Sequence, residues 1–147
     1  MIPALLIAVS LLISACGPPG PPKPPFVAIE AADATKFIRV EIAETEPDRQ
    51  RGLMGRTELE EGAGMIFIWP SDTDSGFWMK DTKLRLSIAF ISAEGQILKM
   101  LDMDPCTADP CPIHDPRVTY RMALEVRQGA FERLGVRVGD RVRLVRS

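Results

Sequence analysis

A proline-rich segment near the start of the chain limits most strongly what the remainder can fold into. Residues 17–25 read GPPGPPKPP, and each proline fixes φ and lacks the backbone donor that helices and sheets use. Such a run favours an extended polyproline II spacer and cannot pack into a core. We therefore expect one globular domain in residues 26–147, a usual length for a single core.

An apolar run, Ile2 to Ala15, precedes this spacer and ends in LISAC at residues 12–16. It is too short to anchor the chain as a transmembrane helix, and its length suits the apolar part of a secretory signal. Its end resembles a lipobox, in which small residues precede a cysteine that becomes lipid-modified. The alternative, a buried N-terminal helix, does not explain the prolines that follow.

We predict that residues 1–15 are a signal peptide, that Cys16 is lipidated, and that residues 16–25 tether the domain to a membrane. The chain would then be exported, face the periplasm or the exterior, and reach its membrane partner through the lipid. Gly17 stands where Asp would retain an enteric lipoprotein at the inner membrane. This residue favours the outer membrane.

The composition is typical of a globular protein. Hydrophobic residues make up 46%, charged residues 26%, and the formal net charge is −2. These values argue against a disordered chain and against a generally basic nucleic-acid binder. We expect no nucleic-acid partner.

Hydrophobic periodicity predicts several short strands. Residues 37–42 alternate as a half-buried strand would, and Thr45 followed by Pro47 is typical of a helix start. A second helix of one or two turns is expected at residues 128–134. Further strands are predicted at residues 64–69, 77–79, 84–91, 96–101, 118–126 and 141–145. The fold class that follows is mainly β, or α+β: a small barrel-like antiparallel or mixed sheet with one or two short helices.

The clearest strand covers residues 118–126. Alternation predicts that one face carries Val118, Tyr120, Met122, Leu124 and Val126, and that the other carries Thr119, Arg121, Ala123, Glu125 and Arg127. We expect Tyr120 to share a face with Leu124.

Several motifs, taken in order, resemble the exported DUF192 family of small domains. The matching segments are RGLM (51–54), GMIF (64–67), FWMKDT (77–82), IAFI (88–91), LEV (124–126) with Gly129, and GD (139–140). They span most of residues 33–145. The family usually has Asn at position 81, Pro at 85 and Asp at 87, where this chain has Asp, Arg and Ser. The resemblance implies no particular reaction, because the family has no defined function.

Two cysteines, Cys106 and Cys111, lie in a proline-rich loop of a chain that we expect in an oxidising compartment. A disulfide is the favoured interpretation, because it would staple the loop and leave no unpaired thiol beside Cys16. A soft-metal site, most simply for copper, is the alternative; its ligands would be Cys106, Cys111 and His114 with Met100 or Met103. Redox exchange is less favoured, because nearby carboxylates would raise the thiol pKa.

A ligand surface is predicted near the FWMKDT segment. Alternation would place Trp78 and Lys80 together, and the polar residues that we single out are Arg51, Lys80, Asp81 and Glu125. The sequence has no nucleophile elbow, zinc-protease motif or phosphate-binding loop, so the catalytic residues are unknown. Asp102 with Asp104, or Asp72 with Asp74, could act as carboxylate pairs, but acids in turns are usually solvated.

These features favour a lipid-anchored cell-envelope protein whose domain is a non-catalytic binding or interaction module without a cofactor. Its partner would be an envelope protein or a small ligand. A copper-handling lipoprotein is the second hypothesis, and an envelope enzyme of unknown reaction is the third.

Overall fold

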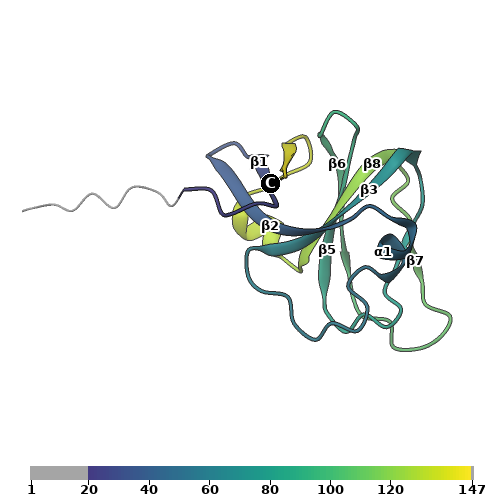
Figure 1. Ribbon diagram of the computed structural model, residues 1–147. Helices are drawn as coiled ribbons and strands as arrows, with labels where there is room; N and C mark the ends of the chain where they lie inside the picture. Colours follow the sequence, from purple (N-terminus) through teal and green to yellow (C-terminus); the bar gives the residue numbers. More distant parts are fainter. Residues whose placement is uncertain (1–19, 147) are drawn as a thin grey trace, which may run out of the picture.

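The computed structural model describes residues 20–146, and within them the fold is a curled seven-stranded sheet with two short helices (Figure 1). Strand accounts for 44% and helix for 9%, so the prediction of a mainly β fold is confirmed. The predicted signal peptide, Cys16 and the start of the tether lie outside the described residues. None of the described helices is long and apolar enough to cross a membrane.

The sheet has the strand order β6-β5-β8-β3-β2-β1-β9 and is antiparallel except where β2 pairs with β3. A parallel pair needs a crossover, and helix α1 supplies it. The strands are β1 (Phe26–Glu30), β2 (Thr35–Ala43), β3 (Ala63–Thr73), β5 (Leu86–Ile91), β6 (Ile97–Met103), β8 (Tyr120–Arg127) and β9 (Arg141–Val145). The helices are α1 (Glu46–Arg51) and α2 (Ala130–Leu134), and a separate pair of strands is β4 (Phe77–Trp78) with β7 (Ile113–His114).

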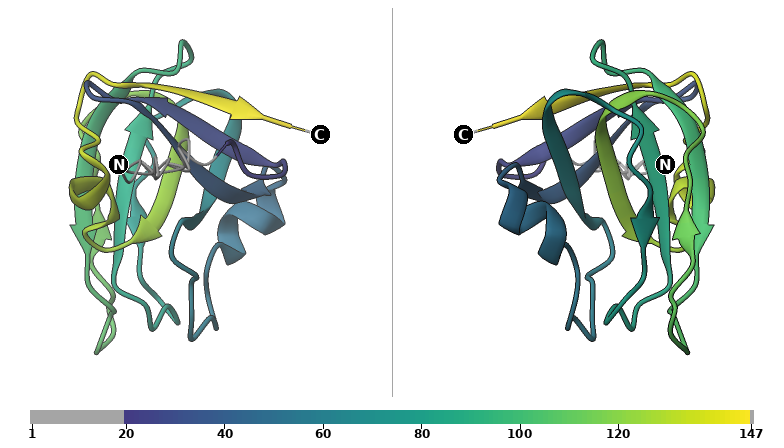
Figure 2. Two further views of the ribbon diagram at one scale, coloured as in Figure 1. Left: turned by 90° about the vertical axis from the view of Figure 1, so that its left-hand side faces the viewer. Right: turned by 90° about the vertical axis from the view of Figure 1, so that its right-hand side faces the viewer.

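The two ends of the sheet approach each other, as Figure 2 shows. A bridge pairs Gln96 with Arg141, and the Val142 amide donates to the Gly95 carbonyl at 2.7 Å. Gly95 has φ +88°, and a Cβ there would lie 2.4 Å from the Val142 carbonyl oxygen. Only glycine fits this junction, where the half-barrel comes nearest to closing.

Two hydrophobic clusters cover the two faces of the sheet. The first contains residues from both sheet ends, such as Ile29 and Ile97, together with Phe131 of α2, so it fills the inside of the curl. The second lies on the outer face beneath α1 and the loops. All six residues of β5 are buried, because the central strands are covered on both faces.

The prediction that Tyr120 shares a face with Leu124 was wrong. Tyr120 packs in the outer cluster with Ala123, whereas Leu124 packs in the inner one. The pairing of β3 with β8 shifts register between Ile68 and Thr73, which breaks the alternation at this end of β8. A bulge of this kind re-aims the side chains beyond it.

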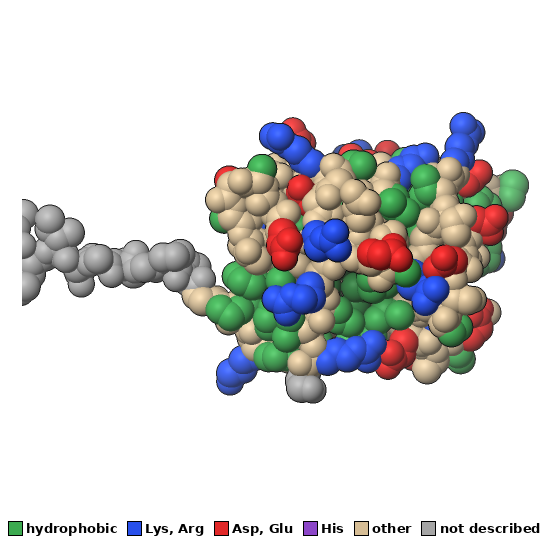
Figure 3. All heavy atoms as spheres, turned by 90° about the horizontal axis from the view of Figure 1, so that it is seen from above, with side chains coloured by type: hydrophobic (Ala, Val, Ile, Leu, Met, Phe, Trp, Pro, Cys, Tyr) green, Lys and Arg blue, Asp and Glu red, His purple; other side chains and the backbone are tan. Residues whose placement is uncertain are grey.

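Charged side chains of both signs are interspersed on the face seen from above in Figure 3. Arg146 pairs with Glu44 at 2.9 Å, and Arg121 pairs with Asp72 at 2.8 Å. The arginines at the C-terminal end are therefore partly neutralised by acids from other elements.

Candidate functional site

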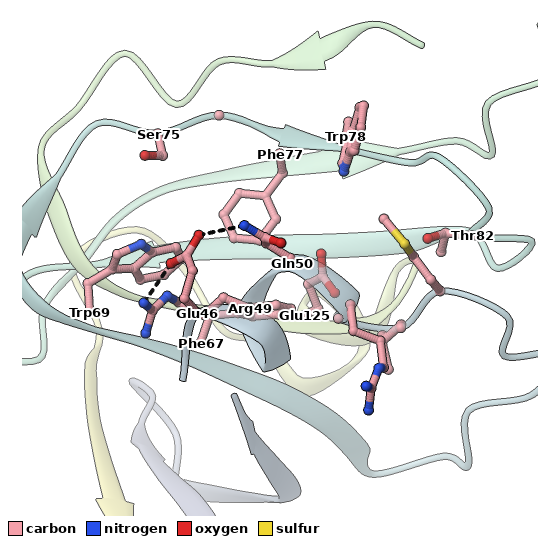
Figure 4. Close-up of a pocket in the computed structure, with 15 residues that line it drawn as sticks. Glu46, Arg49, Gln50, Phe67, Trp69, Ser75, Phe77, Trp78, Thr82 and Glu125 are labelled. Carbon is pink, nitrogen blue, oxygen red and sulfur yellow. Dashed lines mark hydrogen bonds and ion pairs between the residues drawn. The ribbon is translucent and has the colours of Figure 1, made fainter. Parts of the chain in front are cut away.

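A pocket of about 210 Å³ opens on the outer face of the sheet, between α1 and β4. Figure 4 shows the residues around it. Its lining consists of Glu46, Arg49, Gln50, Arg51, Gly52, Leu53, Met54, Phe67, Trp69, Ser75, Gly76, Phe77, Trp78, Thr82 and Glu125. These residues come from α1 and the loop after it, from β3, from the segment through β4, and from β8.

Glu125 is the buried acid of this pocket. It lies on β8, opposite Met65 of β3 and Ile88 of β5, and its side chain is only 5% exposed. Among residues 20–146 no side chain or backbone group forms a hydrogen bond or ion pair with its carboxylate. Burial in this apolar setting raises the pKa of Glu125 to about 8, because desolvation disfavours the charged form.

Helix α1 supplies the polar wall. Thr45 caps it by accepting the Asp48 amide at 3.3 Å, as predicted from the sequence. Glu46 and Gln50 lie four residues apart and therefore on one helix face. The Gln50 Nε2 donates to Glu46 Oε1 at 2.9 Å, an interaction that orients the amide.

Arg49 binds the protein itself through its two Nη atoms, whereas its buried Nε has no hydrogen-bond partner among the described residues. Its Nη2 donates to Glu46 Oε2 at 2.8 Å, and its Nη1 donates to the Ile68 carbonyl at 2.9 Å. Its guanidinium lies 5.5 Å from the centre of the Trp69 ring. Arg49 thus ties α1 to β3 and fixes one edge of the pocket.

Aromatic rings form the apolar walls. Phe77 packs edge-on against Phe67 at 5.2 Å and against Trp69 at 6.0 Å between ring centroids. The segment that carries Phe77 is held in place because the Tyr120 hydroxyl donates to the Ser75 carbonyl at 2.7 Å. Trp78 is 47% exposed and stands at the mouth.

Three of the five residues predicted to form a ligand surface line this pocket: Arg51, Trp78 and Glu125. Lys80 does not line it, but its Nζ lies 5.5 Å from the Trp78 ring. Asp81 is exposed in a turn, with φ +54°, and its carbonyl accepts the Gly55 amide at 2.9 Å. Asp and Asn both tolerate this left-handed conformation, which gives a structural reason for either residue at position 81.

Gln50 and Trp69 were not predicted as site residues, whereas Phe77 belongs to the FWMKDT segment near which a ligand surface was predicted. The helix at Thr45 was predicted, but nothing in so short a helix indicates which face meets the sheet. Trp69 and Phe77 belong to segments that we expected to be strands, and aromatic residues there are as typical of a core as of a pocket. The signal that could have indicated Trp69 is its position before the turn-rich segment 70–76, which contains the end of β3 and leads to β4, so that Phe77 packs against Trp69.

The cysteine pair forms a disulfide, Cys106–Cys111, in the loop between β6 and β7. The five residues of the soft-metal hypothesis are not brought together. Met103 is buried in the outer cluster, whereas Met100 packs against the inner one. No group of three or more His, Cys, Asp or Glu side chains suited to a metal ion occurs in the part of the chain that the structure describes.

The other polar departures from the family pattern have local partners. Arg85 pairs with Asp104 at 2.7 Å. The Ser87 hydroxyl donates to Asp102 Oδ1 at 2.6 Å and accepts the Gly129 amide at 3.0 Å. Asp102 and Asp104 therefore act as separate structural partners.

The fold and pocket define a small, mostly β half-barrel domain with one buried acid on its outer face. The family model of DUF192, described as "Uncharacterized ACR, COG1430", matches residues 27–144. The chain belongs to this family. No curated protein matches it.

Two solved structures share the fold. One, from Sinorhizobium meliloti 1021, is described as a "putative transcription regulator"; it is 31% identical, with a TM-score of 0.74, over 82% of this chain and 92% of its own. The other, a protein of unknown function from Novosphingobium aromaticivorans DSM 12444, is 28% identical, with a TM-score of 0.71, over 80% and 83% of the two chains.

Proposed function

We propose that this chain is a lipid-anchored cell-envelope protein whose half-barrel domain binds a small ligand in the pocket between α1 and β4. The single observation that carries the proposal is the buried carboxyl of Glu125, which lines the pocket and has no protein partner among residues 20–146.

A buried acid without a partner costs folding free energy, because burial removes the water that solvates it. Native structures satisfy nearly all buried polar groups, and groups whose pKa is strongly perturbed cluster at functional sites. The neighbouring β-strand positions in the outer cluster are apolar, such as Met65 and Phe67. An apolar residue at position 125 would fit the same packing, so a ligand is a physical reason for an acid there.

The polar contacts favour binding over catalysis. The Thr82 hydroxyl donates to the Lys80 carbonyl at 3.2 Å, and the Ser75 hydroxyl pairs with that of Thr73 at 2.8 Å. Neither hydroxyl is hydrogen-bonded to a general base, the arrangement that activates such a nucleophile. Glu46 and Arg49 are paired with each other, so the polar groups orient a ligand and none is set up to attack it.

The anchor is proposed from the sequence signal at Cys16. The described part of the tether joins the sheet directly, since the Val40 amide donates to the Pro25 carbonyl at 3.1 Å. In Figure 1 the tether meets the domain on the left, whereas α1 and β7 lie on the right.

Native mass spectrometry of the full chain after export tests both parts of the proposal. We expect a lipid-modified mass that Cys16→Ser removes, and an organic adduct that Glu125→Gln loses. Glu94→Gln is the matched control, because Glu94 lies in the exposed turn before β6. An adduct retained equally by all variants would place the ligand elsewhere, and a copper adduct would support the soft-metal alternative.

A further inference from the structure

Two oxygen acceptors face the pocket, one on a buried side chain and one on an exposed side chain. The first is the Glu125 carboxylate, and the second is the amide oxygen of Gln50. The Gln50 Nε2 is held by Glu46 at 2.9 Å, so its oxygen turns away from Glu46 and towards the side of the pocket where Glu125 lies (Figure 4). The ionised Glu125 carboxylate accepts hydrogen bonds and cannot donate them, so a ligand that binds this form brings the donor.

Two of the three cationic side chains around the pocket contact other groups of the protein. Arg49 is held by Glu46 and by the Ile68 carbonyl, and the Lys80 ammonium lies over the Trp78 ring. Arg51 is exposed at the rim. None of these three forms an ion pair with Glu125 within residues 20–146, so a positive charge beside this carboxylate would have to come with the ligand.

The remaining walls suit a small apolar body. Phe67 and Phe77 meet edge-on at 5.2 Å, and Leu53 and Met54 lie beside them in the lining. An apolar cavity of about 150 Å³ accommodates benzene, which has six non-hydrogen atoms, so this pocket of about 210 Å³ holds a ligand of roughly eight. Aromatic faces also attract a cation that lies over them.

We propose that the ligand is a small organic ammonium ion. Its N–H groups donate to the Glu125 carboxylate and the Gln50 amide oxygen, and its apolar body packs against Phe67 and Phe77. This inference rests on the proposed function, since it names the ligand class of the same pocket.

The competing chemistry has the opposite pH dependence. A neutral ligand with an acceptor oxygen would bind the protonated form of Glu125, which can donate, and its affinity would fall as pH rises. An ammonium ion needs the carboxylate, so its affinity rises with pH. With a free-state pKa of about 8, the ionised fraction grows about 50-fold between pH 6 and pH 8.

Isothermal titration of the full chain with benzylammonium, at pH 6 and pH 8, tests the inference. Benzyl alcohol and benzoate are the matched neutral and anionic probes. At pH 8 we expect benzylammonium to bind and the other two probes not to bind. At pH 6 its affinity should be about 50-fold lower. Glu125→Gln should lower the affinity for benzylammonium at least tenfold and abolish its pH dependence. Glu94→Gln should change neither.

Gln50→Met is a second variant that leaves the sheet untouched, and we expect it to weaken benzylammonium severalfold. Tighter binding of benzyl alcohol or benzoate, or an affinity for benzylammonium that falls with pH, would overturn the ammonium assignment and leave a pocket that binds another class. If none of the probes binds, the assignment is also wrong. The proposed function is then judged separately, by whether the exported chain carries an adduct that depends on Glu125.

Discussion

Replacing Glu125 by glutamine should change how the stability of the protein depends on pH. The carboxyl is buried on β8 and is only 5% exposed. Burial raises its pKa from an ordinary value of 4.5 to about 8. Glutamine has nearly the same shape and never ionises, so Glu125→Gln keeps the packing and removes the titration.

The direction of this pH dependence follows from whether the folded or the unfolded state binds the proton of Glu125. Between pH 4.5 and pH 8 the folded protein keeps a proton on Glu125 that the unfolded chain releases. The folded state binds more protons, so this group's contribution to stability is fully present below pH 4.5 and is lost as pH rises through 8. One pKa unit corresponds to about 1.4 kcal/mol, so the whole loss is about 5 kcal/mol.

Urea unfolding of the wild type, Glu125→Gln and Glu94→Gln at several pH values from 4.5 to 8.5 measures this effect. We expect Glu125→Gln to match the wild type near pH 4.5 and to be more stable by several kcal/mol at pH 8.5. Other carboxylates titrate alike in the two proteins, so their effect cancels in the difference. Parallel curves for the wild type and Glu125→Gln would refute the reasoning.

Three further predictions concern stability. Gly95→Ala should lower the free energy of unfolding by about 2 kcal/mol or more, and by more than Gly139→Ala does. Both glycines have positive φ, but only at Gly95 does a Cβ meet a carbonyl. Equal shifts in the thermal midpoint of the two variants would contradict the tight junction between Gly95 and β9. The double variant Cys106→Ser with Cys111→Ser should cost about 2 kcal/mol in chemical unfolding, through the loop entropy released in the unfolded chain; no change would show that the disulfide contributes nothing. Ser87→Ala should cost about 1–3 kcal/mol, because it leaves the Gly129 amide without its acceptor. Ser92→Ala is the comparison, because Ser92 also accepts backbone amides but lies at the exposed turn before β6. Faster amide exchange at Gly129 should accompany the loss of stability in Ser87→Ala.

The alternation of residues predicted the strands well, because the apolar face of a strand recurs every second residue. The strand expected at residues 37–42 is part of β2, and the hairpin expected around Gly95 joins β5 to β6. The cap at Thr45 was also readable, since it is a local signal. The pairing order of the strands could not be predicted from the sequence, because β2 and β3 pair in parallel and are connected through a short helix.

The candidate site was only partly predictable. Glu125 was singled out as a polar residue in a strand, but its burial depends on the outer cluster, which α1 and the loops complete. Gln50 and Trp69 belong to elements far apart from Glu125 in the sequence, and only the curl of the sheet brings them to one pocket. The five proposed metal ligands lay near one another in sequence, yet the opposite faces of β6 separate Met100 from Met103.

Carbon-detected nuclear magnetic resonance of the Glu125 carboxyl, titrated with pH in the presence and absence of benzylammonium, tests the central claim most directly. We predict a pKa of about 8 in the free protein, and a fall when the ammonium ion binds, because a neighbouring positive charge favours the ionised form. A pKa near 4.5 in the free protein, or a pKa that saturating benzylammonium leaves unchanged, would contradict the proposal that Glu125 is a buried acid whose partner is a cationic ligand.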